Sequence, residues 1–126
     1  MNTIPSLTLQ HNVNLKSFNT FGMNVSALDF VEITDETQLP ALLRMINQYQ
    51  GKVLFMGGGS NMLFTGNFNG LVVRILTKGI EIVDQDDEFV YVRAMAGEVW
   101  DDFVQYCVRM NYGGLENLSL IPGNVG

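Results

Sequence analysis

The chain has 126 residues, of which 47% are hydrophobic and 16% are charged, and its formal net charge is −6. This length and balance suit one globular domain or part of a larger one. The seven lysine and arginine residues are scattered, whereas nucleic-acid binding needs clustered positive charge. We therefore expect no nucleic-acid partner and, without a basic amphipathic helix, no membrane binding.

The expected location is the cytoplasm. Cys107 is the sole cysteine, so no internal disulfide can form and a reducing compartment is the simplest interpretation. The first 20 residues lack the pattern of a signal peptide. No apolar run approaches the roughly 20 residues that a membrane helix needs.

The first half of the chain predicts a strand, a helix and a second strand. Residues 1–22 form a polar N-terminal segment, with a short strand expected around Leu7 and Leu9. Alternating side chains predict a strand over residues 29–33, and Thr34 or Asp35 can cap the helix that follows. Gly51 ends this helix. The expected apolar face of the helix comprises Leu39, Leu42, Leu43, Ile46 and Tyr49. The continuous apolar run 53–56 then predicts a buried strand.

The second half predicts more strands and a second helix. Strands are expected at residues 71–76, 80–84 and 89–95, the last with Phe89, Tyr91 and Arg93 on one face. Between the last two strands, the charged segment 84–88 is interpreted as a solvated hairpin tip rather than a metal site. The helix is expected from about residue 98 to 110, ended by Gly113 and Gly114. Its expected apolar face comprises Trp100, Phe103, Val104, Cys107 and Val108, and its water-facing residues are Asp101, Asp102, Gln105 and Arg109.

The strongest functional signal is the glycine-rich loop directly after the apolar run 53–56. Gly57, Gly58 and Gly59 lack a Cβ atom and can take positive φ, so their N–H groups can point into one concavity that suits phosphate oxygens. Ser60 and Asn61 add a hydroxyl and an amide. A tight turn between strands would also explain three glycines, and from the loop alone the two interpretations have roughly even odds.

Two common nucleotide-binding loops do not fit this segment. A nucleoside-triphosphatase phosphate loop needs a Lys after its last glycine, and none follows Gly59. The dinucleotide motif G-x-G-x-x-G would need a glycine where Met62 stands. A second loop, residues 114–126, contains the turn Pro122-Gly123. Its apolar residues could pack against a flat ring or against the core, and core packing is favoured from this loop alone.

In chain order, NTFG at 19–22, GGGSN at 57–61, AGEVW at 96–100 and GLENLSLIPGNVG at 114–126 resemble the UDP-N-acetylmuramate dehydrogenases, also called UDP-N-acetylenolpyruvoylglucosamine reductases, of bacterial cell-wall synthesis. GGGSN is shared with many flavoproteins, whereas NTFG together with GLENLxLIPGxVG is far more specific. The similarity spans nearly all residues from about Asn14 onward.

The resemblance implies an α+β, FAD-binding fold of the p-cresol methylhydroxylase type. In this fold a small βαβ subdomain is followed by part of a second, mixed or antiparallel-sheet subdomain. We expect residues 23–126 to be the incomplete amino-terminal portion of that FAD-binding domain, with the natural chain continuing beyond Gly126. Non-covalent FAD would lie between the subdomains, with residues 19–22 at the edge of its site. Its expected contacts are Gly57, Gly58, Gly59, Ser60 and Asn61 on one side and Ile121, Pro122, Gly123, Val125 and Gly126 on the other.

The reaction implied by the resemblance takes a hydride from NADPH to FAD and then to the enolpyruvyl ether of a UDP-sugar, giving UDP-N-acetylmuramate. The family's proton-donating serine and its enolate-stabilising arginine and glutamate match no residue of this chain. No catalytic residue is therefore assigned here, and we expect the chain by itself to be inactive and to retain FAD weakly. The alternatives are another FAD oxidoreductase of the same fold, such as a sugar or hydroxy-acid oxidase, and a non-catalytic nucleotide-binding module.

Four other residues receive structural interpretations. His11 is the sole histidine, lies far in sequence from the glycine loop and is expected at the surface without partners. Cys107 is expected to be a small core residue, and Trp100 a core anchor. Glu116 is expected to fix its loop's backbone rather than to react. The acidic residues are dispersed or confined to one turn, so no metal site is expected.

Overall fold

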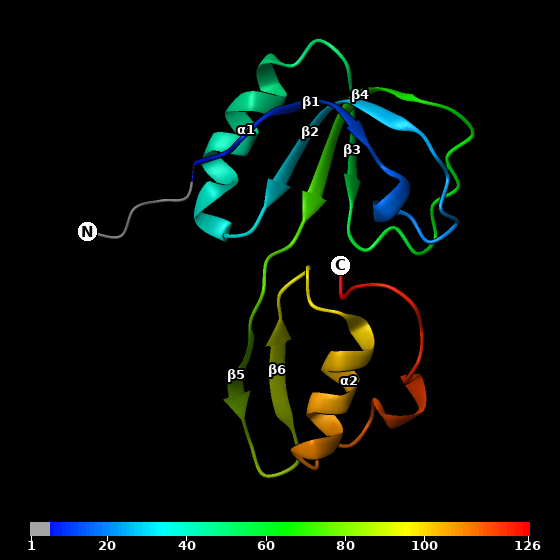
Figure 1. Ribbon diagram of the computed structural model, residues 1–126. Coiled ribbons are helices and arrows are strands. Elements are labelled where there is room, and N and C mark those ends of the chain that lie inside the picture. The colour runs from blue at the N-terminus through cyan, green and yellow to red at the C-terminus, as the bar shows by residue number, and fades with distance from the viewer. Residues whose placement is uncertain (1–5) are drawn as a thin grey trace.

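The computed structural model describes residues 6–126, which form two α+β units joined by a short linker (Figure 1). The first unit is a four-stranded sheet with helix α1 (Leu39–Gln48). The second is a two-stranded hairpin with helix α2 (Trp100–Arg109). Gly126 lies between the two units (Figure 1). Neither helix has the length and apolar character of a membrane-spanning segment.

The first sheet has the strand order β1 (Gln10–Asn14), β2 (Ser26–Ile33), β4 (Phe68–Ile75), β3 (Lys52–Met56). β1 is antiparallel to β2, whereas β2, β4 and β3 are parallel. The β2–α1–β3 crossover is the predicted βαβ unit, and the α+β class is confirmed. The division at residue 22 stays a prediction.

Buried side chains form one cluster on each face of this sheet. Phe30 and Val72 belong to the first cluster, and their chain neighbours Val31 and Val73 belong to the second. This division follows because successive side chains of a strand point to opposite faces. β2 and β4 are therefore buried on both sides, and they fix the position of the loops that leave the sheet.

The start of the first helix differs from the prediction. The side chain of Asp35 caps a 3-10 turn, η2 (Glu36–Gln38), and α1 begins after it with Pro40 in its first turn. Leu39 and Leu43 are 43% and 59% exposed, so their assignment to the apolar face was wrong. The stripe at spacings of three and four residues is instead Leu42, Met45, Ile46 and Tyr49.

Two strand predictions in the first unit also need correction. The run 53–56 was expected to be buried, but Phe55 is 56% exposed because β3 is the last strand of the sheet. Near the N-terminus, the strand lies at Gln10–Asn14 rather than around Leu7 and Leu9. Pairing with β2 makes this polar segment a strand, although its own side chains do not indicate one.

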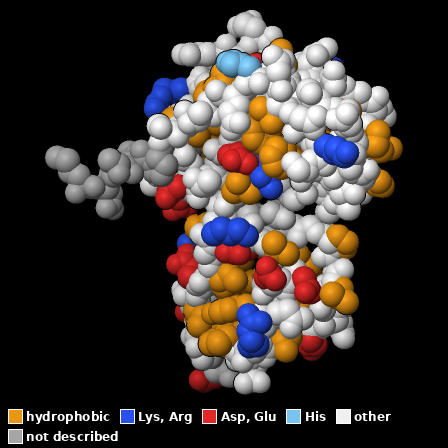
Figure 2. Space-filling model, in the orientation of Figure 1, with side chains coloured by type: hydrophobic (Ala, Val, Ile, Leu, Met, Phe, Trp, Pro, Cys, Tyr) orange, Lys and Arg blue, Asp and Glu red, His pale blue; other side chains and the backbone are white. Residues whose placement is uncertain are grey.

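The second unit contains β5 (Ile80–Gln85) and β6 (Val90–Ala94), which are antiparallel. The predicted alternation is confirmed: Phe89 and Tyr91 are exposed, while Val90 and Val92 face Phe103 and Cys107 of α2. Hydrophobic side chains gather over the second unit on the face shown in Figure 2.

The C-terminal end of α2 departs from the prediction in two ways. Val108 is 45% exposed, so it does not belong to the buried face. The helix is ended by Asn111, whose φ is 58°, and the Tyr112 N–H donates to the Cys107 carbonyl at 2.9 Å. Asn tolerates this left-handed conformation, so Gly113 and Gly114 are not the terminators.

The charged segment 84–88 forms the hairpin tip that the sequence predicted. The Asp86 carboxylate accepts hydrogen bonds from the N–H groups of Glu88 and Phe89 at 2.8 and 2.7 Å. These bonds keep the pKa of Asp86 below its usual value. Among residues 6–126, no group of three or more His, Cys, Asp or Glu side chains could hold a metal ion.

Candidate functional site

The glycine-rich loop leaves the sheet at the carboxyl end of β3. Ligands of open sheets with parallel strands bind characteristically at this edge. Gly59 has φ +68°, and a Cβ atom there would overlap the carbonyl oxygen of Phe18. The Thr20 N–H donates to the Gly59 carbonyl at 3.2 Å. The glycine at position 59 is therefore required by packing against segment 18–20.

The NTFG segment, residues 19–22, contains the turn that packs against the glycine-rich loop. Asn19 is buried, and its amide nitrogen donates to the carbonyl oxygens of Leu15 and Met23 at 2.8 and 3.1 Å. Its Oδ1 accepts the Met23 N–H at 2.9 Å. Asn19 thus fixes the turn on which Gly59 packs.

The backbone N–H groups of residues 57–61 are not consumed by the fold. None of these amides donates a hydrogen bond to another residue within 6–126. The Ser60 hydroxyl and the Asn61 amide are likewise unpaired within that range. A run of uncommitted donors beside glycines is what a diphosphate needs, so the residues present fit such a group.

The second loop packs across the glycine loop. A Cβ atom at Gly57 would lie 3.1 Å from the Gly126 carbonyl oxygen, and one at Gly58 would lie 2.7 Å from Oδ1 of Asn124. A Cβ atom at Gly123 would lie 3.0 Å from Oγ of Ser60. The two predicted halves of the site, which are about sixty residues apart in sequence, are therefore in contact.

The end of the second loop is held by backbone hydrogen bonds to residues just before α2 and to its first residue. The Val125 N–H donates to Glu98 at 2.9 Å, and the Gly126 N–H donates to Ala96 at 3.0 Å. The Gly123 carbonyl accepts the Trp100 N–H at 2.9 Å. Val125 and Gly126 can therefore line a cofactor but have no free backbone donor, whereas the amides of Ile121 and Gly123 bond to no described residue.

Asp101 lies on the polar face of α2 as expected, but it is half-buried and its carboxylate has partners in the second loop. Its carboxylate accepts hydrogen bonds from the Leu120 N–H at 2.6 Å and the Ser119 hydroxyl at 2.7 Å. These two bonds, the backbone one first, keep the pKa of Asp101 below its usual value. Helical periodicity correctly placed Asp101 on the polar face of α2. It could not show that residues 119–120 of the second loop pack against that face.

The loop-fixing role expected for Glu116 is confirmed. Its carboxylate accepts the Gly114 N–H at 2.6 Å. The pKa of Glu116 is lowered by its own backbone N–H, then by those of Gly114 and Leu115. The Trp100 indole N–H donates to the Leu118 carbonyl at 2.8 Å, and its ring contacts Phe103 edge-on.

His11 is exposed as expected, but it is not without a partner. Its Nδ1 lies 2.5 Å from Oδ1 of Asp29, and the Tyr49 hydroxyl donates to the other oxygen of Asp29 at 2.5 Å. Burial, and then the bond to Asp29, raise the pKa of Tyr49 to about 12. Cys107 is buried, and burial raises the pKa of its thiol, as expected for a core residue.

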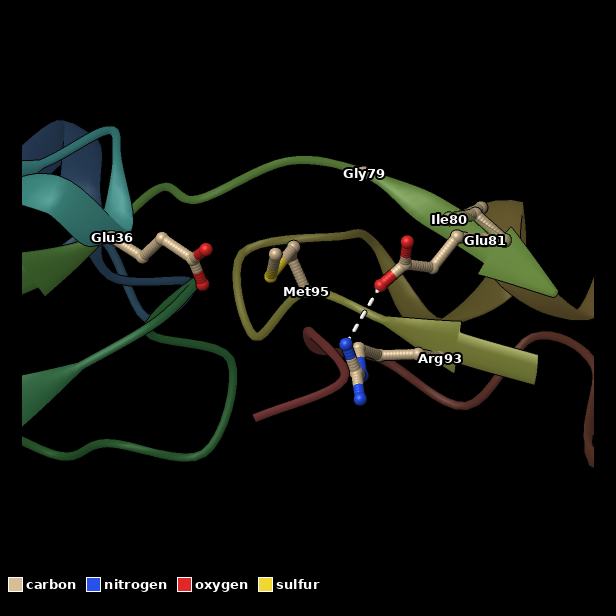
Figure 3. Close-up of a pocket in the computed structure, with 6 residues that line it drawn as sticks. All are labelled: Glu36, Gly79, Ile80, Glu81, Arg93 and Met95. Carbon is tan, nitrogen blue, oxygen red and sulfur yellow. Dashed lines mark hydrogen bonds and ion pairs between the residues drawn. The ribbon is translucent and has the colours of Figure 1, made fainter. Parts of the chain in front are cut away.

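A pocket of about 330 Å³ lies at the junction of the linker and the hairpin (Figure 3). Arg93 and Glu81 pair across it at 2.9 Å, and Glu36 points into it from the first unit. Charged side chains of both signs gather where the two units meet (Figure 2). None of the ten predicted contact residues lines this pocket.

Comparison with known proteins places the chain in a family. A family profile described as "FAD binding domain" matches residues 27–126. The chain is 45% identical over 120 residues to a UDP-N-acetylenolpyruvoylglucosamine reductase of Flavobacterium johnsoniae, covering 95% of this chain and 35% of the relative. It is 46% identical over 121 residues to the protein of that name in Chromobacterium violaceum, covering 96% and 36%. The chain thus spans about a third of the length of these relatives.

A solved structure shares the fold. The crystal structure of UDP-N-acetylenolpyruvylglucosamine reductase from Thermus caldophilus superposes with a TM-score of 0.69 at 22% identity, covering 96% of this chain and 41% of that one. With the profile match over residues 27–126, it follows that this chain belongs to the FAD binding domain family.

Proposed function

We propose that this chain forms the FAD-binding part of a UDP-N-acetylenolpyruvoylglucosamine reductase of peptidoglycan synthesis, acting in the cytoplasm. The relatives of that name that support the proposal are 45% and 46% identical to almost the whole chain. The structural observation that carries it is the row of uncommitted N–H groups at residues 57–61, crossed by residues 123–126.

In this proposal the chain's task is to hold and orient the cofactor. Backbone donors of Gly57, Gly58, Gly59, Ser60 and Asn61 would bind the diphosphate of FAD. Ile121, Pro122, Gly123, Val125 and Gly126 would line its other side. Donors fixed by the fold need no rearrangement when the charge arrives, which favours tight binding.

FAD, when bound, would supply hydride transfer from NADPH to the enolpyruvyl ether of the UDP-sugar. No residue of this chain is assigned to proton delivery, so the catalytic acid is expected outside it. The attachment of FAD is proposed to be non-covalent, because His11 lies on β1, in a strand remote from β3 in the sheet order.

The test is made on the whole protein that carries this chain. Purified protein should be yellow, should release all its FAD on denaturation, and should oxidise NADPH only when UDP-N-acetylenolpyruvoylglucosamine is present. Flavin reduction by a free sugar or hydroxy acid instead would favour an oxidase of the same fold. Protein that binds nucleotides but takes up no FAD would leave a nucleotide-binding module as the remaining explanation.

A further inference from the structure

Arg74 lies beside the glycine loop at the carboxyl edge of the parallel strands. It is the residue before the last in β4, and its partner across the ladder is Met56, the residue before Gly57. Side chains of paired residues in a sheet lie on the same face. The Cε atom of Met56 is 3.1 Å from the position of a Cβ atom at Gly59. Arg74 is therefore separated from the loop by one side chain.

A second residue, Phe18, connects Arg74 to the same loop. The guanidinium carbon of Arg74 lies 4.5 Å from the centroid of the Phe18 ring, a cation–π contact that fixes the plane of the charged group. The carbonyl oxygen of Phe18 abuts Gly59. The ring of Phe18 also stacks on Phe30 at 5.3 Å, so this platform is anchored in the core.

Most donors of this guanidinium are unused. Nη1 donates to Glu32 at 2.9 Å, but Nε is buried and has no hydrogen-bond partner within residues 6–126. A guanidinium carries five N–H donors in a fixed fork that matches phosphate oxygens. The side chain as a whole is 23% exposed, so an anion can approach the guanidinium and supply the acceptor that the buried Nε lacks.

Because the chain is acidic overall, a positively charged side chain near the loop matters for binding an anion. The net charge is −6, which opposes the binding of a diphosphate. Lys52 is the first residue of β3, so it lies at the amino end of the strand, away from the glycine-rich loop. Lys78 and Arg93 are paired with Glu98 and Glu81 in the linker and the hairpin. Arg74 is also paired, with Glu32 at 2.9 Å, but of these four cations it is the one at the carboxyl ends of the strands, where the free amides lie.

We infer that Arg74 is a binding residue for the diphosphate of FAD and that Glu32 restrains it until the cofactor arrives. The inference rests on the proposed function and adds to it a charged side chain that complements the backbone donors. A UDP-sugar also carries a diphosphate and is the alternative ligand for Arg74. The experiment distinguishes the diphosphate of FAD from that of the UDP-sugar.

The experiment measures FAD affinity of the apo form of the whole protein by flavin fluorescence. Arg74→Gln should raise the dissociation constant roughly tenfold or more, the loss expected for a hydrogen bond to a charged group, and should reduce the dependence of affinity on salt. Glu32→Gln removes the competing carboxylate and should keep or tighten FAD binding by roughly threefold. Arg93→Gln, which removes the same charge from the pair at 2.9 Å in the hairpin, should leave FAD affinity unchanged.

These variants separate binding from a purely structural role. If the pair with Glu32 only stabilised the fold, both substitutions would lower the melting temperature and FAD affinity together, and the inference would be wrong. An Arg74→Gln dissociation constant within twofold of wild type would also overturn it. Arg74→Lys keeps a charge without the fork and should recover part of the affinity.

Two further measurements identify the anion. Riboflavin, which lacks the diphosphate, should bind wild type and Arg74→Gln equally, and equal losses for FAD and riboflavin would refute the assignment. If Arg74→Gln raised only the KM of the UDP-sugar and left FAD affinity unchanged, Arg74 would bind the diphosphate of the UDP-sugar instead. That result would overturn the inference. Wild-type protein that takes up no FAD at all would instead defeat the proposed function itself.

Discussion

The carboxylate of Asp101 accepts a 2.6 Å hydrogen bond from the backbone N–H of Leu120. Leu120 has φ 61°, a left-handed conformation that is unfavourable for a leucine, and its side chain is 82% exposed. The apolar side chain therefore contributes little to holding this residue in place. Asp101, in the first turn of α2, keeps the second loop in the shape that brings it onto the glycine loop.

Replacing Asp101 should loosen that loop. In Asp101→Ala the amide of Leu120 loses its acceptor, so its hydrogen exchange should accelerate and FAD affinity should fall. The neighbouring Asp102 has no hydrogen bond or ion pair within residues 6–126, so Asp102→Ala is the matched control. Equal exchange rates in the two variants would show that the bond to Asp101 does not hold the loop.

The pH dependence of this loop follows from the lowered pKa of Asp101. The folded pKa lies below the ordinary value of 3.8, so the stabilisation is complete above pH 3.8 and is lost as the pH falls toward the folded pKa. The difference in Leu120 exchange between wild type and Asp101→Ala should therefore be constant near neutrality and should shrink below pH 3.8. A difference that persists unchanged in acid would contradict this explanation.

A side chain at position 59 should lower the stability of the fold. Gly59→Ala places a Cβ atom against the Phe18 carbonyl and forces an L residue to φ +68°, so the free energy of unfolding should fall by roughly 2 kcal/mol or more. Gly66 has no atom within 4 Å of its would-be Cβ, and Gly66→Ala should change stability by no more than about 0.5 kcal/mol. Urea unfolding of the whole protein measures both. Equal values would mean that the turn adjusts without strain.

Gly58 and Asn124 should be energetically coupled. A Cβ atom at Gly58 would lie 2.7 Å from Oδ1 of Asn124, whose amide nitrogen donates to the Gly97 carbonyl at 3.2 Å. Gly58→Ala should therefore weaken FAD binding by displacing Asn124, and Asn124→Ala should restore much of it. Contacting residues show coupling energies of roughly 0.5–3 kcal/mol. A double-mutant cycle with no coupling would mean that the loops do not pack as described.

Tyr49 should stabilise the first unit in a pH-dependent way. Its hydroxyl donates to the mostly buried Asp29, so Tyr49→Phe should cost about 1–2 kcal/mol of unfolding free energy at neutral pH. The folded pKa is raised from 10.0 to about 12, so this contribution is complete below pH 10 and is lost as the pH rises toward 12. Tyr106 has no side-chain hydrogen bond within residues 6–126, and Tyr106→Phe is the control. A Tyr49→Phe penalty that is unchanged at pH 11 would exclude this mechanism.

The sequence predicted the two loops that come into contact better than it predicted the boundaries of the elements. The resemblance carried by the motifs at 57–61 and 114–126 identified both loops, whereas the second loop taken alone favoured core packing. Helical periodicity found Leu42 and Cys107 but misassigned Leu43 and Val108, because the buried width of a helix depends on its neighbours. The strand Gln10–Asn14 was missed because its order comes from pairing with β2.

The sequence by itself determined the α+β class, the βαβ unit and the two loops that meet at the candidate site. These features depend on local periodicity and on glycine chemistry, which act over a few residues. The tertiary structure decided the contacts between distant residues. These are the contact of Gly58 with Asn124, the hydrogen bond from Leu120 to Asp101, and the position of Arg74 over the Phe18 ring. Each of these joins residues between 19 and 66 positions apart, and local sequence patterns carry no information about which distant segments the core brings together.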